Sequence, residues 1–222
     1  MRYRFLTLFV ALLATMLIYP VLRGPGGSVL AANLLVTAIC GAGARVMLGE
    51  TRRGTLKMLV TVPPVLGLWL GYFAPQSATD GMVVFIHAFA MSFHLLMLYV
   101  VLRSVYLEDR ITADGVFGAM CGYLLLGFAF SHGYGIVETL NPHSFQTGDT
   151  LTRADEHLVL TYFSFVTLTT VGFGDVVPAV PLARSLAIVE AIVGQFYIAV
   201  LVADLIGKRL AHSMEAAPPT RP

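Results

Sequence analysis

The sequence predicts an all-α membrane protein with six transmembrane helices and one shorter re-entrant helix. Of its 222 residues, 57% are hydrophobic and 12% are charged, whereas about a quarter of the residues of a soluble domain are charged. A helix needs about 20 apolar residues to cross the hydrocarbon core of a bilayer. Six apolar stretches meet this requirement, and they cover residues 5–22, 28–48, 56–73, 82–102, 115–134 and 181–207.

The first span, residues 5–22, follows Arg2 and Arg4 in the manner of a signal peptide. Its apolar run of about 18 residues is longer than the core of a typical signal peptide, and no small-residue cleavage site follows promptly. We therefore expect a true transmembrane helix at this position.

The second and third spans, residues 28–48 and 56–73, are assigned from hydropathy. The Pro63–Pro64 pair lies early in the third span, where proline kinks or delays a helix. The two cysteines, Cys40 and Cys121, both lie inside apolar runs. We expect them to be small packing residues and not a disulfide or a metal pair.

The fourth span, residues 82–102, contains no arginine, and Arg103 and Arg110 lie at or beyond its end. A voltage sensor needs several arginines at every third position, because each charge moved across the membrane is worth about 2.3 kcal/mol per 100 mV. The four-span unit over residues 1–110 therefore lacks the ladder of charges that sensing voltage requires. We expect no steep voltage dependence.

His87 and His94 are seven residues apart in the fourth span and so share one helix face. A histidine inside the membrane is a candidate functional residue, and this pair suits a pH sensor or a site for a metal or haem. The alternative is a hydrogen bond to a neighbouring helix or a place near the interface, and the sequence favours that alternative.

A short apolar stretch over residues 157–168 is the candidate re-entrant helix. Twelve residues at 1.5 Å each reach about 18 Å, roughly half of the membrane. The motif Thr170-Val171-Gly172-Phe173-Gly174 follows it directly. Such a backbone can present successive carbonyls to a dehydrated cation, and its glycines adopt conformations that residues with a Cβ resist. Non-helical backbone at this depth must line a water-filled path or be buried in protein.

Residues 111–210 form the second predicted domain, and three stretches of it carry a family resemblance. They read GVFGAMCGYLLLGFAF (115–130), YFSFVTLTTVGFGDVVP (162–178) and RSLAIVEAIVGQFYIAVLVADLIG (184–207). They resemble the two-helix pore domain of tetrameric potassium channels, most closely that of bacterial six-span channels without a working voltage sensor. The likeness covers a little under half of the chain and is most specific at the Thr-Val-Gly-Phe-Gly motif.

The resemblance implies roles for the residues of this motif. Thr170, Val171, Gly172 and Phe173 would supply carbonyl oxygens to K⁺, and Thr170 would add its hydroxyl at the inner end. Gly174 would turn the chain out of the selectivity filter, and Thr169 and Asp175 would support it. Because one chain has one such segment, a closed ring of four requires a homotetramer.

Three positions depart from the family pattern. Phe173 replaces a more common tyrosine, Tyr162-Phe163 stand where some relatives have two tryptophans, and Val166 stands where some have a carboxylate. These departures predict fewer side-chain hydrogen bonds around the filter. We therefore expect stable selectivity together with a greater tendency to close at the filter.

The last span carries three residues of interest, Glu190, Gly194 and Asp204. Glu190 must face protein or water because a carboxyl group is costly in lipid. Gly194 suits either a gating hinge, the role of such a glycine in the resembling family, or a close-packing site. Asp204 suits either a ring at the inner mouth or an ion pair with Lys208 one turn later.

Basic residues predict the orientation of the spans. With the N-terminus in the cytoplasm, only Arg23, Arg153 and Arg184 of the 14 Lys and Arg residues lie outside, as the positive-inside rule requires. Both termini, including a short tail over residues 211–222, are then cytoplasmic, and the protein lies in the cell (inner) membrane. The net charge of +1 gives no reason to expect a nucleic-acid partner.

These features together favour a passive potassium channel in a lipid bilayer, with no catalytic activity and no cofactor besides the permeant K⁺. One alternative is a cation channel that does not discriminate K⁺ from Na⁺, against which the intact motif argues. A second is a membrane redox or metal protein that uses His87 and His94. A third is a non-conducting subunit that modifies another channel, which a complete motif disfavours.

Overall fold

The computed structural model describes residues 4–23, 28–47, 79–107, 112–147 and 153–215, together with scattered positions between 62 and 73. Most of the third predicted span, and the end of the predicted tail beyond Glu215, lie outside the described residues. The described part is mainly helical, and its long apolar helices are those of a membrane protein.

Six helices and two short strands have defined bounds within the described residues. Their bounds are α1 Arg4–Arg23, α2 Val29–Met47, α4 Asp80–Tyr106, α5 Ala113–Leu140, β1 Phe145–Thr147, α6 Arg153–Leu168, β2 Val176–Pro178 and α7 Pro181–Glu215. Within the described residues, four stretches are long and apolar enough to cross a membrane: Arg4–Leu22, Asp80–Tyr106, Ala113–Leu140 and Pro181–Lys208. The 19-residue helix α2 coincides with the second predicted span.

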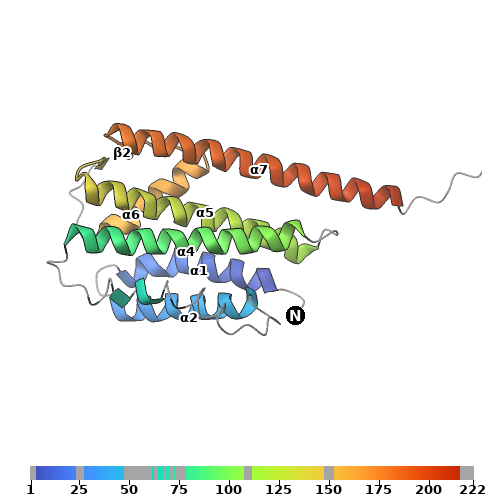
Figure 1. The fold of residues 1–222 in the computed structure, drawn as a ribbon, viewed down its shortest axis with the longest axis horizontal. Helices are drawn as coiled ribbons and strands as arrows, with labels where there is room; N and C mark the ends of the chain where they lie inside the picture. The colour runs from blue at the N-terminus through green and yellow to red at the C-terminus, as the bar shows by residue number, and fades with distance from the viewer. Residues whose placement is uncertain are drawn as a thin grey trace, which may run out of the picture.

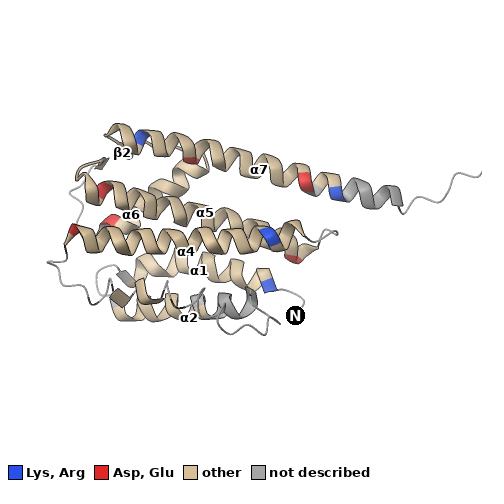
Figure 2. Cartoon of the chain, in the orientation of Figure 1, with Lys and Arg blue, Asp and Glu red and all other residues tan. Residues whose placement is uncertain are grey.

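The long helices run side by side along one axis, and α6 lies obliquely between α5 and α7 (Figure 1). α5 is central, because it packs against α1, α4, α6 and α7. Charged residues gather mostly near the two ends of the helix bundle, whereas its middle is largely uncharged (Figure 2). This distribution suits helices whose middles lie in hydrocarbon.

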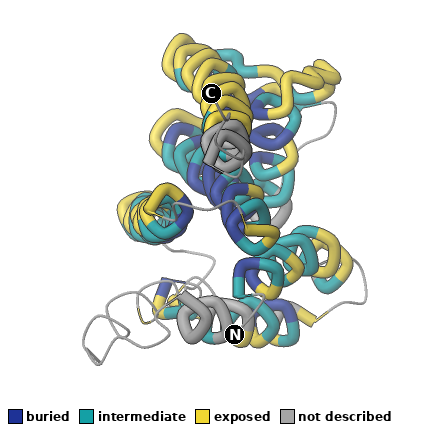
Figure 3. The backbone as a smooth tube through the Cα atoms, turned by 90° about the vertical axis from the view of Figure 1, so that its right-hand side faces the viewer, coloured by how far each residue is buried: buried dark blue, intermediate teal, exposed yellow. Residues whose placement is uncertain are grey.

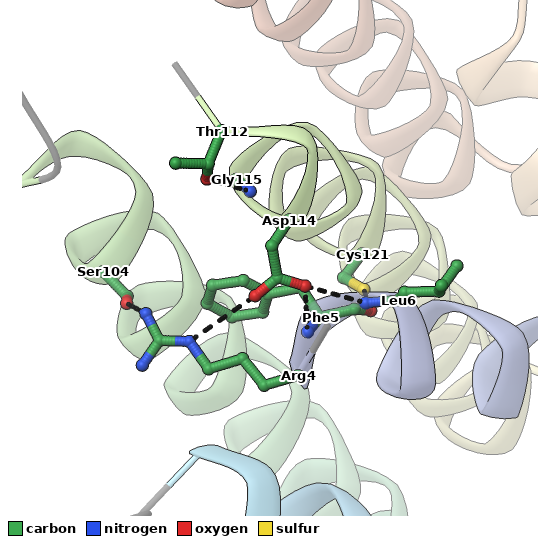
Figure 4. A network of polar contacts seen from close by, with 8 residues as sticks. All are labelled: Arg4, Phe5, Leu6, Ser104, Thr112, Asp114, Gly115 and Cys121. Atoms are coloured by element: carbon green, nitrogen blue, oxygen red, sulfur yellow. Dashed lines mark hydrogen bonds and ion pairs between the residues drawn. The ribbon is translucent and has the colours of Figure 1, made fainter. Parts of the chain in front are cut away.

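The start of α1 is fixed to the start of α5 by a polar network (Figure 4). The Asp114 carboxylate accepts hydrogen bonds from the backbone N–H groups of Phe5, at 2.8 Å, and Leu6, at 3.3 Å. It also pairs with Arg4, whose guanidinium donates to the Ser104 hydroxyl on α4 at 3.0 Å. A carboxylate at a helix N-terminus satisfies donors that have no partner within the helix, so the network joins three helices at one end of the bundle.

Gly118 and Gly122 of α5 form a Gly-x-x-x-Gly pattern, which predicts close packing against the last span, but the two glycines have different neighbours. A Cβ on Gly122 would lie 2.3 Å from the Tyr197 hydroxyl of α7, as expected, but a Cβ on Gly118 would lie 2.7 Å from Val105 on α4. The second contact corrects the prediction, since Gly118 instead allows α4 and α1 to approach α5 closely. Cys121 is a free, buried cysteine, in agreement with a packing role.

Candidate functional site

The helix before the motif is short and embedded among longer ones. α6 has 16 residues and begins four residues before the predicted stretch, so it reaches about 24 Å and stops short of crossing a bilayer of about 30 Å. Leu160, Phe163 and Leu168 are buried on α6. The Tyr123 hydroxyl of α5 donates a hydrogen bond to the Leu168 carbonyl at 2.9 Å, which fixes the end of α6 within the protein.

Residues 170–174, which the sequence predicts to be a filter and which we call the filter segment, alternate between two backbone conformations. Thr170, Gly172 and Gly174 have positive φ angles of 59°, 59° and 79°, while Val171 and Phe173 between them do not. The left-handed conformation is costly for a residue with a Cβ. Glycine at 172 and 174 therefore allows an alternation that most sequences would resist.

Hydrogen bonds to the end of α6 orient the peptide units of this segment. The N–H groups of Val171 and Gly172 both donate to the Val166 carbonyl, at 3.0 and 3.3 Å, and that of Thr170 donates to Thr167 at 2.9 Å. In a trans peptide unit the N–H and C=O groups point in opposite directions. The carbonyls of residues 169, 170 and 171 therefore point away from α6, as a row.

The residues that carry this row, 169–171, are exposed in the single chain, and so are residues 172–175. Val171 is 53% exposed and Phe173 is 70% exposed. α7 is also exposed along much of its length (Figure 3). Its exposed large apolar residues are Leu182, Ile188, Val189, Ile192, Val193, Phe196, Ile198, Val200, Val202 and Ile206. An apolar surface of this extent faces lipid or other protein.

Side-chain hydrogen bonds hold the two ends of the filter segment. The Thr169 hydroxyl donates to the Phe165 carbonyl at 2.6 Å. The Tyr162 hydroxyl donates to the Asp175 carboxylate at 2.7 Å, and its ring stacks on Phe173 with 6.5 Å between ring centroids. The sequence predicted fewer hydrogen bonds around this segment because Tyr162 stands where some relatives have tryptophan. The hydrogen bond from Tyr162 to Asp175 was not predicted.

Behind α6, a buried carboxyl group joins three helices. Glu190 of α7 is fully buried, as its position in the membrane required. It accepts a hydrogen bond from the Tyr134 hydroxyl of α5 and lies 2.5 Å from the Ser164 hydroxyl of α6. The Ser164 hydroxyl also contacts the Gly127 carbonyl at 2.7 Å. The sequence predicted that Glu190 would avoid lipid. It did not predict that Tyr134 and Ser164 would be its side-chain partners.

The two gating candidates on α7 have clear neighbours. A Cβ on Gly194 would lie 2.7 Å from the Leu168 carbonyl, so this glycine allows close contact with the end of α6, the second of its two interpretations. Asp204 pairs with Lys208 at 3.0 Å, which is likewise the second of its two interpretations. His87 and His94 lie away from this segment, on the side of α4 that faces α5.

Comparison with known proteins agrees with this description. Residues 119–208 match the model of a family described as ion channel. The matched region runs from within α5 through α6 and the filter segment to Lys208 on α7. No curated protein and no solved structure matches the chain. Residues 119–208 of the chain are thus similar to an ion-channel family, and this region includes the row of carbonyls.

Proposed function

We propose that this protein is a potassium-selective channel in which four copies of the chain surround one pore. Each chain contributes the carbonyls of Thr170, Val171, Gly172 and Phe173, which together replace the water around a dehydrated K⁺. The observation that carries the proposal is that the carbonyls of residues 169, 170 and 171 are directed away from α6, on an exposed side of the region that is similar to ion channels. The motif extends the assignment to the carbonyls of Gly172 and Phe173.

The same geometry supports a homotetramer. One chain provides one side of a cage, and a closed cage requires copies related by rotation. The exposed apolar face of α7 gives neighbouring copies a surface to bury. The C-terminus of α6 would point its partial negative charge toward the shared axis, where it favours a cation.

We expect flux from liposomes containing the purified protein to favour K⁺ over Na⁺ strongly and to be blocked by barium. The reason is that carbonyl rings compensate the dehydration of K⁺ better than that of Na⁺. Uptake of radioactive rubidium, used in place of K⁺, and of radioactive sodium into the same vesicles measures the ratio of K⁺ to Na⁺ flux. Comparable uptake of the two ions would instead favour a non-selective cation channel.

Voltage is expected to have little effect on this channel. Only Arg103 among the described residues of α4 is an arginine, and it lies in the last turn, so no ladder of charges crosses the membrane there. Recordings in planar bilayers should show a conductance that changes gently over 100 mV. A steep rise within a few tens of millivolts would contradict this expectation.

Tyr162→Phe should make closures at the filter more frequent. The change removes the hydroxyl bonded to Asp175 but keeps the ring on Phe173. A hydrogen bond of this kind contributes about 1 kcal/mol, which is about a fivefold change in the equilibrium between open and closed filters. Single-channel open probability measures it. Tyr99→Phe, at an exposed tyrosine of α4, is the matched control, and equal open probabilities in both variants would contradict the role of Tyr162.

A further inference from the structure

Four histidines from three helices meet in the half of the bundle that contains the start of α6. His87 and His94 come from α4, His132 from α5 and His157 from α6. The His132 ring is central: its centroid lies 5.0 Å from that of His157, 5.1 Å from that of His94 and 5.5 Å from that of His87. The cluster is distinct from the filter segment, which follows the opposite end of α6.

Three of these histidines can direct ring nitrogens at one point. His87, His132 and His157 each offer one nitrogen such that all three lie within 4.8 Å of one another. The Nδ1 atoms of His87 and His132 are 3.2 Å apart. In a tetrahedral zinc site with Zn–N bonds of about 2.0–2.1 Å, neighbouring nitrogens are about 3.4 Å apart. One edge of the site therefore already has nearly the spacing that an ion would impose.

The surrounding backbone makes room for this arrangement. A Cβ on Gly135 of α5 would lie 2.5–2.8 Å from three atoms of the His87 ring, so only glycine leaves space for the ring there. His94 is held differently, because its Nδ1 contacts the Ala90 carbonyl at 2.7 Å and its ring packs on His132. His94 therefore supports the central ring, and the other three supply the nitrogens.

We propose that His87, His132 and His157 bind one divalent transition-metal ion. Imidazole nitrogens suit Zn²⁺, Cu²⁺, Ni²⁺ and Co²⁺, whereas Mg²⁺ and Ca²⁺ require oxygen ligands. Three nitrogens leave one position of a tetrahedron open for water or another ligand. The bound ion would join α4 directly to α5 and α6, and so connect the first four spans to the helix that precedes the filter segment.

Cobalt binding to the purified full-length protein tests this proposal. We expect one Co²⁺ per chain after dialysis, with the intense visible absorption of a four-coordinate site, and displacement of that absorption by Zn²⁺. Weak absorption typical of six-coordinate Co²⁺, or less than half an ion per chain, would overturn the proposal whatever the variants show. This measurement does not depend on ion conduction, so it is separable from the test of the channel.

Three variants locate the ion. His132→Gln should weaken Co²⁺ binding at least about tenfold, since loss of even an outer-shell partner costs 10–100-fold in metal affinity. Gly135→Ala should weaken it by displacing the His87 ring without removing a ligand. His143→Asn, in the exposed turn after α5, is the control and should bind like the parent protein. Unchanged affinity in folded His132→Gln, or equal loss in His143→Asn, would overturn the assignment.

Discussion

Gly172→Ala is expected to reduce potassium flux by at least about a hundredfold. Gly172 has a φ of 59°, and a residue with a Cβ loses about 1–2 kcal/mol in this left-handed conformation. In a ring of four chains each alanine has this conformational cost, so the total cost is about 4–8 kcal/mol. The alanine backbone would relieve that strain by rotating, and the carbonyls that replace the water around K⁺ would rotate with it.

Flux from liposomes, normalised to the amount of reconstituted tetramer, measures this effect. Gly81→Ala is the matched control, because Gly81 lies in the first turn of α4 without a positive φ and with no atom within 4 Å of an added Cβ. It should conduct like the parent protein. If Gly172→Ala retained more than half of the parent flux with unchanged selectivity, the filter segment would not be the conducting element.

The apolar helices and the unusual backbone conformation of Gly172 and Gly174 could be predicted from the sequence for local reasons. A run of apolar residues produces a span wherever it lies in the chain, and the two glycines of the motif fix the backbone on which they sit. Helix ends were less predictable. α5 continues to Leu140 and α4 to Tyr106, past the end of the apolar runs, because polar residues at a helix end can extend beyond the hydrocarbon.

The contacts behind the filter segment could not be predicted, because they join residues far apart in the sequence. Tyr162 meets Asp175 13 residues later, and Tyr134 meets Glu190 56 residues later. Nothing local signals either pair. The spacing of His87 and His94 predicted that they share one helix face. It could not predict His132, whose ring lies closest to both, because His132 belongs to another helix.

Glu190→Leu is expected to destabilise the protein by about 1–3 kcal/mol, whereas Glu190→Gln should cost less than about 1 kcal/mol. The Ser164 hydroxyl has one hydrogen but contacts two oxygens, the Gly127 carbonyl and the Glu190 carboxyl. If that hydrogen goes to Gly127, the bond between Ser164 and Glu190 needs a hydrogen on the carboxyl group. A glutamine amide supplies that hydrogen and still accepts from Tyr134. Leucine does neither, and leaves the buried Tyr134 hydroxyl without this acceptor, which costs about 1–3 kcal/mol.

Melting temperatures of the purified variants, followed by the fluorescence of the single tryptophan, measure these differences. Adding Tyr134→Phe to Glu190→Leu should recover much of the lost stability, because the double variant removes the unpaired hydroxyl, while Ser164 keeps the Gly127 carbonyl. Tyr134→Phe alone should be destabilising, because it leaves one oxygen of Glu190 without a donor. Additive losses in the double variant would mean that the two side chains stabilise the fold independently, and that the carboxyl group does not join α7 to α5 through this bond.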